Sequence, residues 1–201
     1  MKIKKTEAAA VLALILCIVI NMISFGAQCA HIKSDVLRMH IIANSDSAAD
    51  QRLKLSVRDA LLERGYDIFD GARTLPEAKK QVIENMEKIQ MIVDDVLKKS
   101  GSSYTAKLTL GKAFFDTRYY ESFTLPAGEY EALKVVIGEG KGHNWWCVMF
   151  PQLCLAASDN IRSMQALTDE EKQLILSNPK IEVRFKCVEI YEKLKKSLKN
   201  H

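Results

Sequence analysis

The stretch Asp35–Asp50, DVLRMHIIANSDSAAD, contains the two patterns from which the fold class follows. Its first part alternates between apolar and other side chains, as in a β-strand with one buried side. The predicted inward set is Leu37, Met39 and Ile41, and the opposite set is Arg38 and His40. A polar run at 44–47 ends this strand, and Ser47 followed three residues later by Asp50 indicates a helix N-terminus. We expect this helix to end at Arg64, before Gly65.

Helical spacing recurs further along the chain. Thr74 begins a capping box with Pro76 in its first turn, and the apolar spacing after it predicts one continuous helix that ends before Gly101. Thr168 with Glu171 begins another capped helix. The segment Ile181–Leu198 also has helical spacing.

Strand patterns lie between these helices. Tyr104–Leu110 alternates, and Tyr130–Ile137 ends in β-branched residues, so we expect the two segments to pair as antiparallel strands. Val148–Phe150 fits either a short strand or a helical turn. Together the elements predict an α+β fold: one small, mainly antiparallel sheet covered by helices on one face.

The first 30 residues have the order of a targeting segment. Met1–Lys5 contains three lysines, the unbroken apolar run Ala8–Ile20 follows, and small residues come next. Extending the run to Ala27 gives about 20 residues, just enough to span a bilayer. A cleaved export signal and a retained membrane anchor both fit. In either case we expect the body, residues 31–201, to cross the membrane as a single α+β domain, in contact with that membrane until any cleavage.

The charge of the chain is weak. Its formal net charge is +4, and the N-terminal 30 residues carry +2 of this, which leaves +2 for the body. Nucleic-acid binding normally needs a strong basic field, so a nucleic-acid partner gains no support.

The stretch Gly138–Cys154, GEGKGHNWWCVMFPQLC, has the most unusual composition of the chain. Glycines at alternate positions suggest a flexible loop, and the adjacent Trp145 and Trp146 are typical anchors of binding surfaces. Because neighbouring residues of an extended segment face opposite ways, we expect one tryptophan to be core and the other to be exposed. The alternative is that both tryptophans bury against the sheet as a core plug.

The two cysteines of this stretch, Cys147 and Cys154, fit a disulfide in an exported protein, and a pair of buried thiols is the alternative. Their spacing is not that of a zinc site, and we expect no metal. Cys147 or Cys154 with His143 and Asn144 has the residue types of a nucleophilic thiol site, although such groups normally converge from distant segments.

Arg38 and His40 fit either a site on the open face of the sheet or a hydrogen-bonded structural cluster. No arrangement of residues makes a convincing catalytic or cofactor-binding set, so we expect neither catalytic residues nor a cofactor. A secreted thiol-dependent hydrolase and a cell-wall-binding module remain as alternative functions.

Several runs together resemble the stage II sporulation protein R family, and they cover most of the body. The runs are Val36–Ser47, Asp50–Gln51, Val57–Asp59, Leu125–Leu133, Gly138–Cys154 and Val183–Lys186. One departure is Gln152, where the family pattern has a second proline.

This resemblance implies a signalling protein of endospore formation. Such a protein is exported from the forespore into the space between the forespore and the mother cell. There it would activate a membrane-embedded aspartic protease of the mother cell, which removes the pro-sequence of a sigma factor. The protein itself would be an activator and not an enzyme. The family brings no residue roles, so the predicted contact set comes from the residues themselves: His143, Asn144, Trp145 and Trp146, with Arg38 and His40 nearby.

Overall fold

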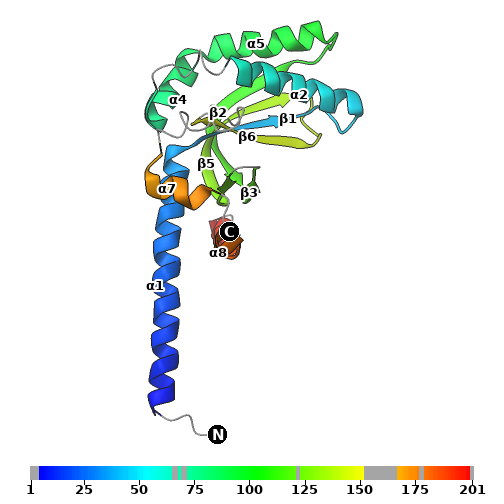
Figure 1. The fold of residues 1–201 in the computed structure, drawn as a ribbon. Coiled ribbons are helices and arrows are strands. Elements are labelled where there is room, and N and C mark those ends of the chain that lie inside the picture. Colours follow the sequence, from blue (N-terminus) through cyan, green and yellow to red (C-terminus); the bar gives the residue numbers. More distant parts are fainter. Residues whose placement is uncertain are drawn as a thin grey trace.

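The computed structural model describes residues 5–64, 68, 72–120, 123–151, 167–176 and 179–199 (Figure 1). Its helices are α1 (Lys5–Asp35), α2 (Ala48–Glu63), α4 (Leu75–Glu84), α5 (Met86–Lys99), α7 (Asp169–Ile175) and α8 (Pro179–Lys199). Its strands are β1 (Leu37–Ile42), β2 (Ala106–Phe115), β3 (Arg118–Tyr119), β4 (Thr124–Leu125), β5 (Gly128–Ile137) and β6 (Asn144–Phe150). The predicted α+β class is confirmed.

The main sheet has the strand order β2-β5-β1-β6. β2 pairs antiparallel with β5, as expected, and β6 pairs antiparallel with β1. β1 and β5 are parallel, so the sheet is mixed, with two of its three pairings antiparallel. The stretch around Val148 is a strand and not a helical turn. β3 and β4 form a separate two-stranded sheet.

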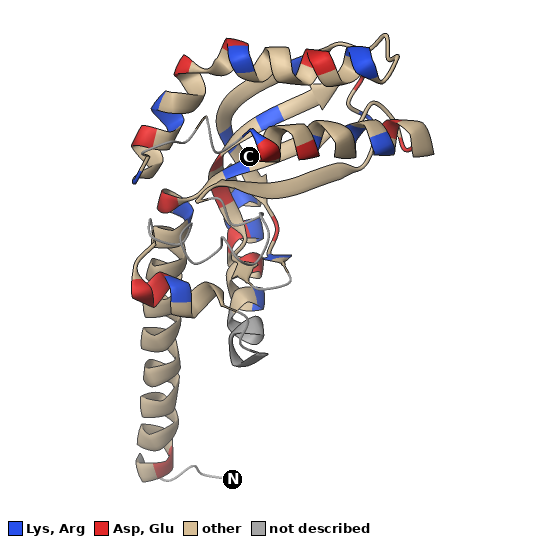
Figure 2. Cartoon of the chain, turned by 45° about the horizontal axis from the view of Figure 1, so that its top comes forward, with Lys and Arg blue, Asp and Glu red and all other residues tan. Residues whose placement is uncertain are grey.

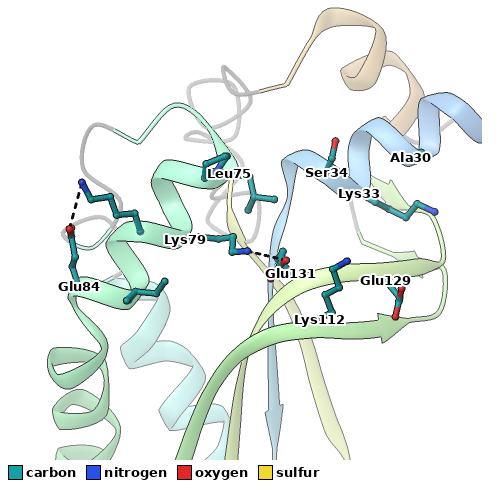
Figure 3. A pocket seen from close by; sticks show the side chains of 12 residues that line it. Ala30, Lys33, Ser34, Leu75, Lys79, Glu84, Lys112, Glu129 and Glu131 are labelled. Carbon is teal, nitrogen blue, oxygen red and sulfur yellow. Dashed lines mark ion pairs between the residues drawn. The ribbon is translucent and has the colours of Figure 1, made fainter.

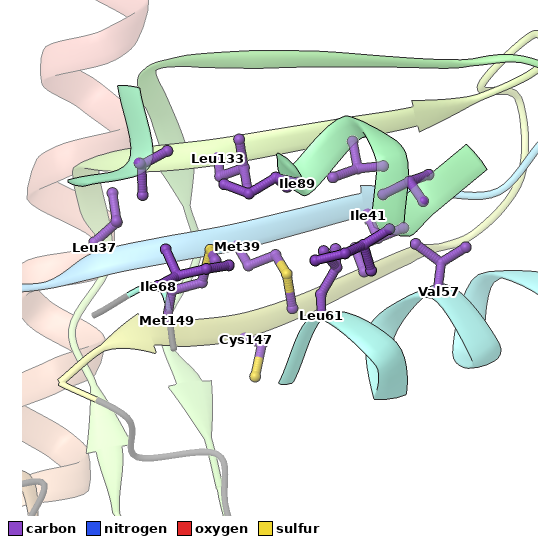
Figure 4. Close-up of a cluster of buried hydrophobic side chains, with 14 of the residues drawn as sticks. Leu37, Met39, Ile41, Val57, Leu61, Ile68, Ile89, Leu133, Cys147 and Met149 are labelled. Atoms are coloured by element: carbon purple, nitrogen blue, oxygen red, sulfur yellow. The ribbon is translucent and has the colours of Figure 1, made fainter. Parts of the chain in front are cut away.

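One face of the main sheet is covered by α2, α4 and α5, which lie above it in Figure 1. The cluster between these layers, here called the aliphatic cluster, is built mainly from Leu, Ile, Val and Met side chains (Figure 4). Leu37, Met39 and Ile41 of β1 are fully buried in it, as the alternation predicts. Ser47 caps α2 by accepting a hydrogen bond from the backbone N–H of Asp50, which confirms the predicted helix start.

The helix predicted to run without a break from Thr74 is two helices. α4 and α5 meet at Asn85, whose backbone leaves the helical conformation at φ −101° and ψ 12°. The Asn85 side chain donates a hydrogen bond to the Gln81 carbonyl at 2.9 Å. An asparagine side chain that bonds nearby backbone competes with the helical ladder, and the sequence spacing alone does not reveal this competition. The break lets both helices follow the sheet.

The opposite face is covered as well, by the C-terminal end of α1, by α7 and by α8. Phe25, Cys29 and Ile32 of α1 are buried here, in what we call the aromatic cluster. Arg38 and His40 face this side and are 0% and 8% exposed. The expectation that β1 has only one buried side was therefore wrong, because segments from both ends of the chain pack over the side that was expected to be open.

The N-terminal part of α1 projects from the body as a single long helix (Figure 1). Among the described residues it is the one helix long and apolar enough to cross a membrane. Its side chains from Val11 to Ile20 are exposed, and Figure 2 shows that this part carries almost no charge. These features fit a signal sequence or an anchor.

Candidate partner-contact site

The predicted contact set lies on and around β6, an edge strand of the main sheet. β6 is extended, so successive side chains point to opposite faces. Trp145 packs against the aliphatic cluster, and Trp146 packs against the aromatic cluster. The opposite orientation is as predicted, but both rings are half-buried, so the expectation of one core and one exposed tryptophan was wrong.

An arginine covers each tryptophan. The Arg58 guanidinium of α2 lies 4.4 Å from the Trp145 ring centroid, and that of Arg118 lies 5.2 Å from the Trp146 ring centroid. Cation–π contacts of this kind hold a ring in one orientation. Trp145 Nε1 is buried and has no hydrogen-bond partner. Part of each indole is therefore exposed in a fixed orientation, with one indole on each side of the edge strand.

The underside of Trp146 is a stack of rings. His40 lies parallel to it with centroids 3.7 Å apart, and Phe115 meets it edge-on at 4.8 Å. Burial is the main cause that lowers the pKa of His40 from its ordinary value of 6.5. A neutral imidazole stacks on indole without the cost of burying a charge. His40 thus supports Trp146 from below and is itself nearly inaccessible.

Arg38 is the central side chain of the aromatic cluster. Its guanidinium carbon lies 4.0 Å from the Phe115 ring centroid and 5.0 Å from that of Tyr130, and Nη2 donates to the Tyr120 hydroxyl at 2.5 Å. Nε and Nη1 have no hydrogen-bond partner, and no carboxylate of the described residues pairs with them. Burial lowers the pKa of Arg38. In the structure described, Arg38 is enclosed by aromatic rings and exposes no surface.

The loop before β6 is fixed, contrary to the flexible loop that its glycines suggested. The backbone N–H groups of Lys141 and Gly142 donate to the carbonyls of Asn44 and Ala43 at 3.0 and 2.9 Å. The N–H of Glu139 donates to the Asn44 side chain at 3.0 Å. Gly142 lies so close to the β1–α2 loop that a Cβ atom there would be 2.2 Å from the Ser45 carbonyl oxygen. Here glycine permits close packing rather than motion.

Asp46 fastens this loop at its end. Its carboxylate accepts a hydrogen bond from the His143 backbone N–H at 2.6 Å and also contacts His143 Nδ1. The hydrogen bond with the His143 side chain is the first cause that lowers the pKa of Asp46, and the backbone bond adds to it. His143 and Asn144 are both exposed. The loop therefore presents two polar side chains directly beside the tryptophans.

A second carboxylate organises the β1–α2 loop from inside. Asp50 accepts hydrogen bonds from Asn44 Nδ2 at 2.9 Å and from the Ser45 hydroxyl at 2.5 Å, and these bonds lower its pKa. Lys54 of α2 donates to the His143 carbonyl at 3.0 Å. The sequence pattern explained Asp50 by helix capping alone and did not reveal these contacts. The signal lay in the composition of 44–51, which is richer in polar side chains than one helix cap requires.

The cysteine hypotheses stay open in part. Cys147 is 1% exposed on the aliphatic side of β6, so it offers no accessible nucleophile in this structure. The free cysteines of the described residues are Cys17, Cys29 and Cys187. Cys154 lies outside the described residues, and the bond between Cys147 and Cys154 stays a prediction. Mass mapping under non-reducing conditions tests it.

A separate pocket of about 780 Å³ lies between the end of α1, α4 and strands β2 and β5 (Figure 3). Lysines and glutamates both line it, and Lys79 pairs with Glu131 at 3.0 Å. Because the two signs are mixed, the pocket has no single-sign field that would select a charged ligand. It lies at the β2–β5 end of the sheet, whereas β6 is the opposite edge strand. We assign it no role in the contact site.

Comparison with known proteins identifies the family to which this chain belongs. The family model of Stage II sporulation protein R matches residues 33–160, which include β1, β6 and every residue of the predicted contact set. The chain belongs to the stage II sporulation protein R family. This family consists of signalling proteins of sporulation rather than enzymes.

A curated relative, Stage II sporulation protein R of Bacillus subtilis (strain 168), is 34% identical over 140 residues. The match covers 70% of this chain and 62% of the relative, so the chain spans somewhat less than two thirds of that protein's length. No solved structure matches. Within the family match, the runs at 36–47 and 138–154 that carried the resemblance are joined by the hydrogen bonds between the β1–α2 loop and the loop before β6.

Proposed function

We propose that this chain is an exported sporulation signal that activates a membrane-embedded aspartic protease, which then processes a sigma factor precursor of the mother cell. In this proposal the protein leaves the forespore and acts in the space between the two cells. Membership of the stage II sporulation protein R family supports it, as does the apolar N-terminal helix.

The observation that carries the proposal is the presentation of Trp145 and Trp146 on a rigid edge strand. Binding energy in protein interfaces is concentrated in a few aromatic and arginine side chains. Half-buried indoles that are already held in place lose little conformational entropy on binding. In our proposal the exposed parts of both indoles, with His143 and Asn144, contact the protease.

Arg38 and His40 have a different role in this proposal. Both are buried, so they do not touch the partner. His40 stacks on Trp146, and Arg38 acts through Phe115, which contacts both side chains. Binding at the contact surface would shift the protease toward its active state, because a ligand moves an equilibrium only by binding one state more tightly.

Coexpression of this chain with the protease and its precursor substrate tests the proposal, with precursor cleavage as the readout. We expect cleavage only when the chain is present. Replacing both indoles, by Trp145→Ala with Trp146→Ala, should reduce cleavage at least about tenfold, as loss of a binding hot spot does. Met91→Ala on α5, at a site 63% exposed, is the matched surface control and should have no effect.

Thermal unfolding of each variant separates a lost contact from a lost fold. A double variant that remains folded and supports full cleavage would contradict the contact surface. Cleavage that proceeds equally without the chain would contradict the activator function itself.

A further inference from the structure

The C-terminal helix α8 has an apolar surface that no described part of the protein covers. Ile190, Tyr191, Leu194 and Leu198 are 54%, 61%, 61% and 79% exposed. Their spacing places them, with the exposed Cys187, along one side of the helix. Phe185, Val188 and Glu189 lie on the opposite side and are buried. Exposed apolar stripes of this size on soluble proteins usually mark an interaction surface.

α8 packs where α1 leaves the body. The Phe25 and Phe185 rings lie 5.4 Å apart, and Lys33 of α1 pairs with Glu192 at 2.5 Å. N-terminal to Phe25, α1 is exposed along its length. The segment from Lys5 to Ser24 spans roughly 30 Å at the rise of an α-helix, close to the hydrocarbon thickness of a bilayer. If this segment lies in a bilayer, Phe25 marks the membrane surface, and α8 lies at that level.

The direction of α8 fits this surface. In Figure 1 α1 stands upright and α8 is seen along its axis, so the two helices cross at a large angle. A helix that crosses a membrane-spanning helix in this way runs along the membrane plane. The body lies above α8, whereas the exposed part of α1 extends below it. Since the apolar stripe is opposite the buried side of α8, it lies on the side away from the body.

The charges of α8 fit a lipid surface. Four lysines and two glutamates lie between Phe185 and Leu198. Both glutamates have lysine partners, Glu189 with Lys193 at 2.7 Å and Glu192 with Lys33. Lys195 and Lys196 form no ion pair within the described part of the chain, and both are exposed. The Lys196 ammonium lies 4.5 Å from the Phe114 ring centroid of β2, on the body side of α8, whereas Lys195 lies beside the apolar stripe. A lysine beside an apolar stripe, as Lys195 is, fits a helix that lies in the interface of an anionic membrane.

We propose that α8 lies in the interface of the bilayer that α1 enters, with Ile190, Leu194 and Leu198 among the acyl chains and Lys195 at anionic headgroups. α1 and α8 then attach the body to the membrane at two places, which fixes its orientation. The contact surface at β6 plays no part in this proposal, so loss of protease activation and loss of lipid contact are separate outcomes.

A nitroxide label on the natural Cys187 tests the proposal in the full chain, with Cys17→Ser to leave Cys187 as the exposed free thiol of the described residues. The chain is reconstituted into vesicles of phosphatidylglycerol and phosphatidylcholine, and collisions with a water-soluble nickel reagent are measured. We expect collisions about fivefold fewer than at a label introduced by Met91→Cys with Cys187→Ser on distant α5, because interfacial helices bury their apolar side. Equal collisions at the two positions would overturn the proposal.

Two variants make the comparison sharper. Leu194→Asp with Leu198→Asp should raise the collisions at Cys187 to the level at position 91, whereas Ser197→Asp, beside the stripe, should change them little. Both replace exposed side chains, so thermal unfolding should be unchanged. Protection that disappears when the protein is diluted in lipid would assign the stripe to a second copy of the chain and overturn the proposal. Equal protection in pure phosphatidylcholine would overturn the role of Lys195.

Discussion

The two faces of the main sheet are covered by different chemistry. The cluster under α2, α4 and α5 is almost wholly aliphatic, and those helices come from the stretch of the chain between β1 and β2. The cluster on the other face contains Phe25, Phe115, Phe123, Tyr130 and Phe185, and it surrounds the buried cation of Arg38. The helices that cover it, α1, α7 and α8, come from both ends of the chain. The first face is an ordinary domain core, whereas the second joins the core to the N-terminal helix, to α8 and to Trp146.

The aliphatic face should carry most of the stability. Ile41 is fully buried at the centre of β1, so Ile41→Ala should lower the free energy of unfolding by about 3 kcal/mol, as large-to-small core changes do. Denaturant unfolding measures this. Ile83→Ala on α4, 61% exposed, is the matched control and should change it by less than about 0.5 kcal/mol. A loss below about 1 kcal/mol for Ile41→Ala would show that this face is not the main core.

The loop contact at the end of the sheet should have an intermediate effect. A methyl group at position 142 meets the Ser45 carbonyl oxygen, so Gly142→Ala should cost about 2 kcal/mol through overpacking. Gly111→Ala on β2 is the control, since a Cβ atom there meets nothing within 4 Å, and we expect no loss. Thermal and denaturant unfolding compare them. Equal stability of the two variants would mean that the loop before β6 adapts easily and is not the rigid support we describe.

The predictable part of the structure is the part in which local pattern and packing agree. Alternation placed Leu37, Met39 and Ile41 in the core, and the capping boxes at Thr74 and Thr168 located the starts of α4 and α7. The burial of Arg38 and His40 was not predictable in this way. It depends on α1, α7 and α8, and nothing local in β1 reveals that distant segments cover that face.

The candidate site also has one feature that the sequence predicts and one that it does not. The opposite orientation of Trp145 and Trp146 follows from strand geometry and was predictable. The fixed conformation of the loop before β6 was not predictable, because its glycines fit a flexible loop and a closely packed loop equally well. Only the distance from Gly142 to Ser45 and the bonds to Asn44 and Asp46 distinguish these readings.

The smallest expected effect concerns the aromatic face alone and comes from pH. The folded protein lowers the pKa of His40 below 6.5, first through burial and then through Lys134, Arg118 and Arg38, against an opposing hydrogen bond with Asn144. The unfolded chain therefore binds the proton more readily. The stability that neutral His40 provides is complete above pH 6.5 and is lost as the pH falls toward its lower folded-state pKa.

The variant His40→Phe separates the effect of His40 protonation from the effect of ring stacking. Phenylalanine also packs on Trp146 but binds no proton. Between pH 7.5 and 5.5 the unmodified protein should lose at most about 1 kcal/mol more unfolding free energy than the variant. Asp46 and Asp50 do not interfere, because their lowered pKa values place their titration below 3.8. Unfolding followed by tryptophan fluorescence measures the difference. Parallel pH profiles would mean that His40 is not held neutral under Trp146, and that the support of this indole comes from Phe115 and Arg118 instead.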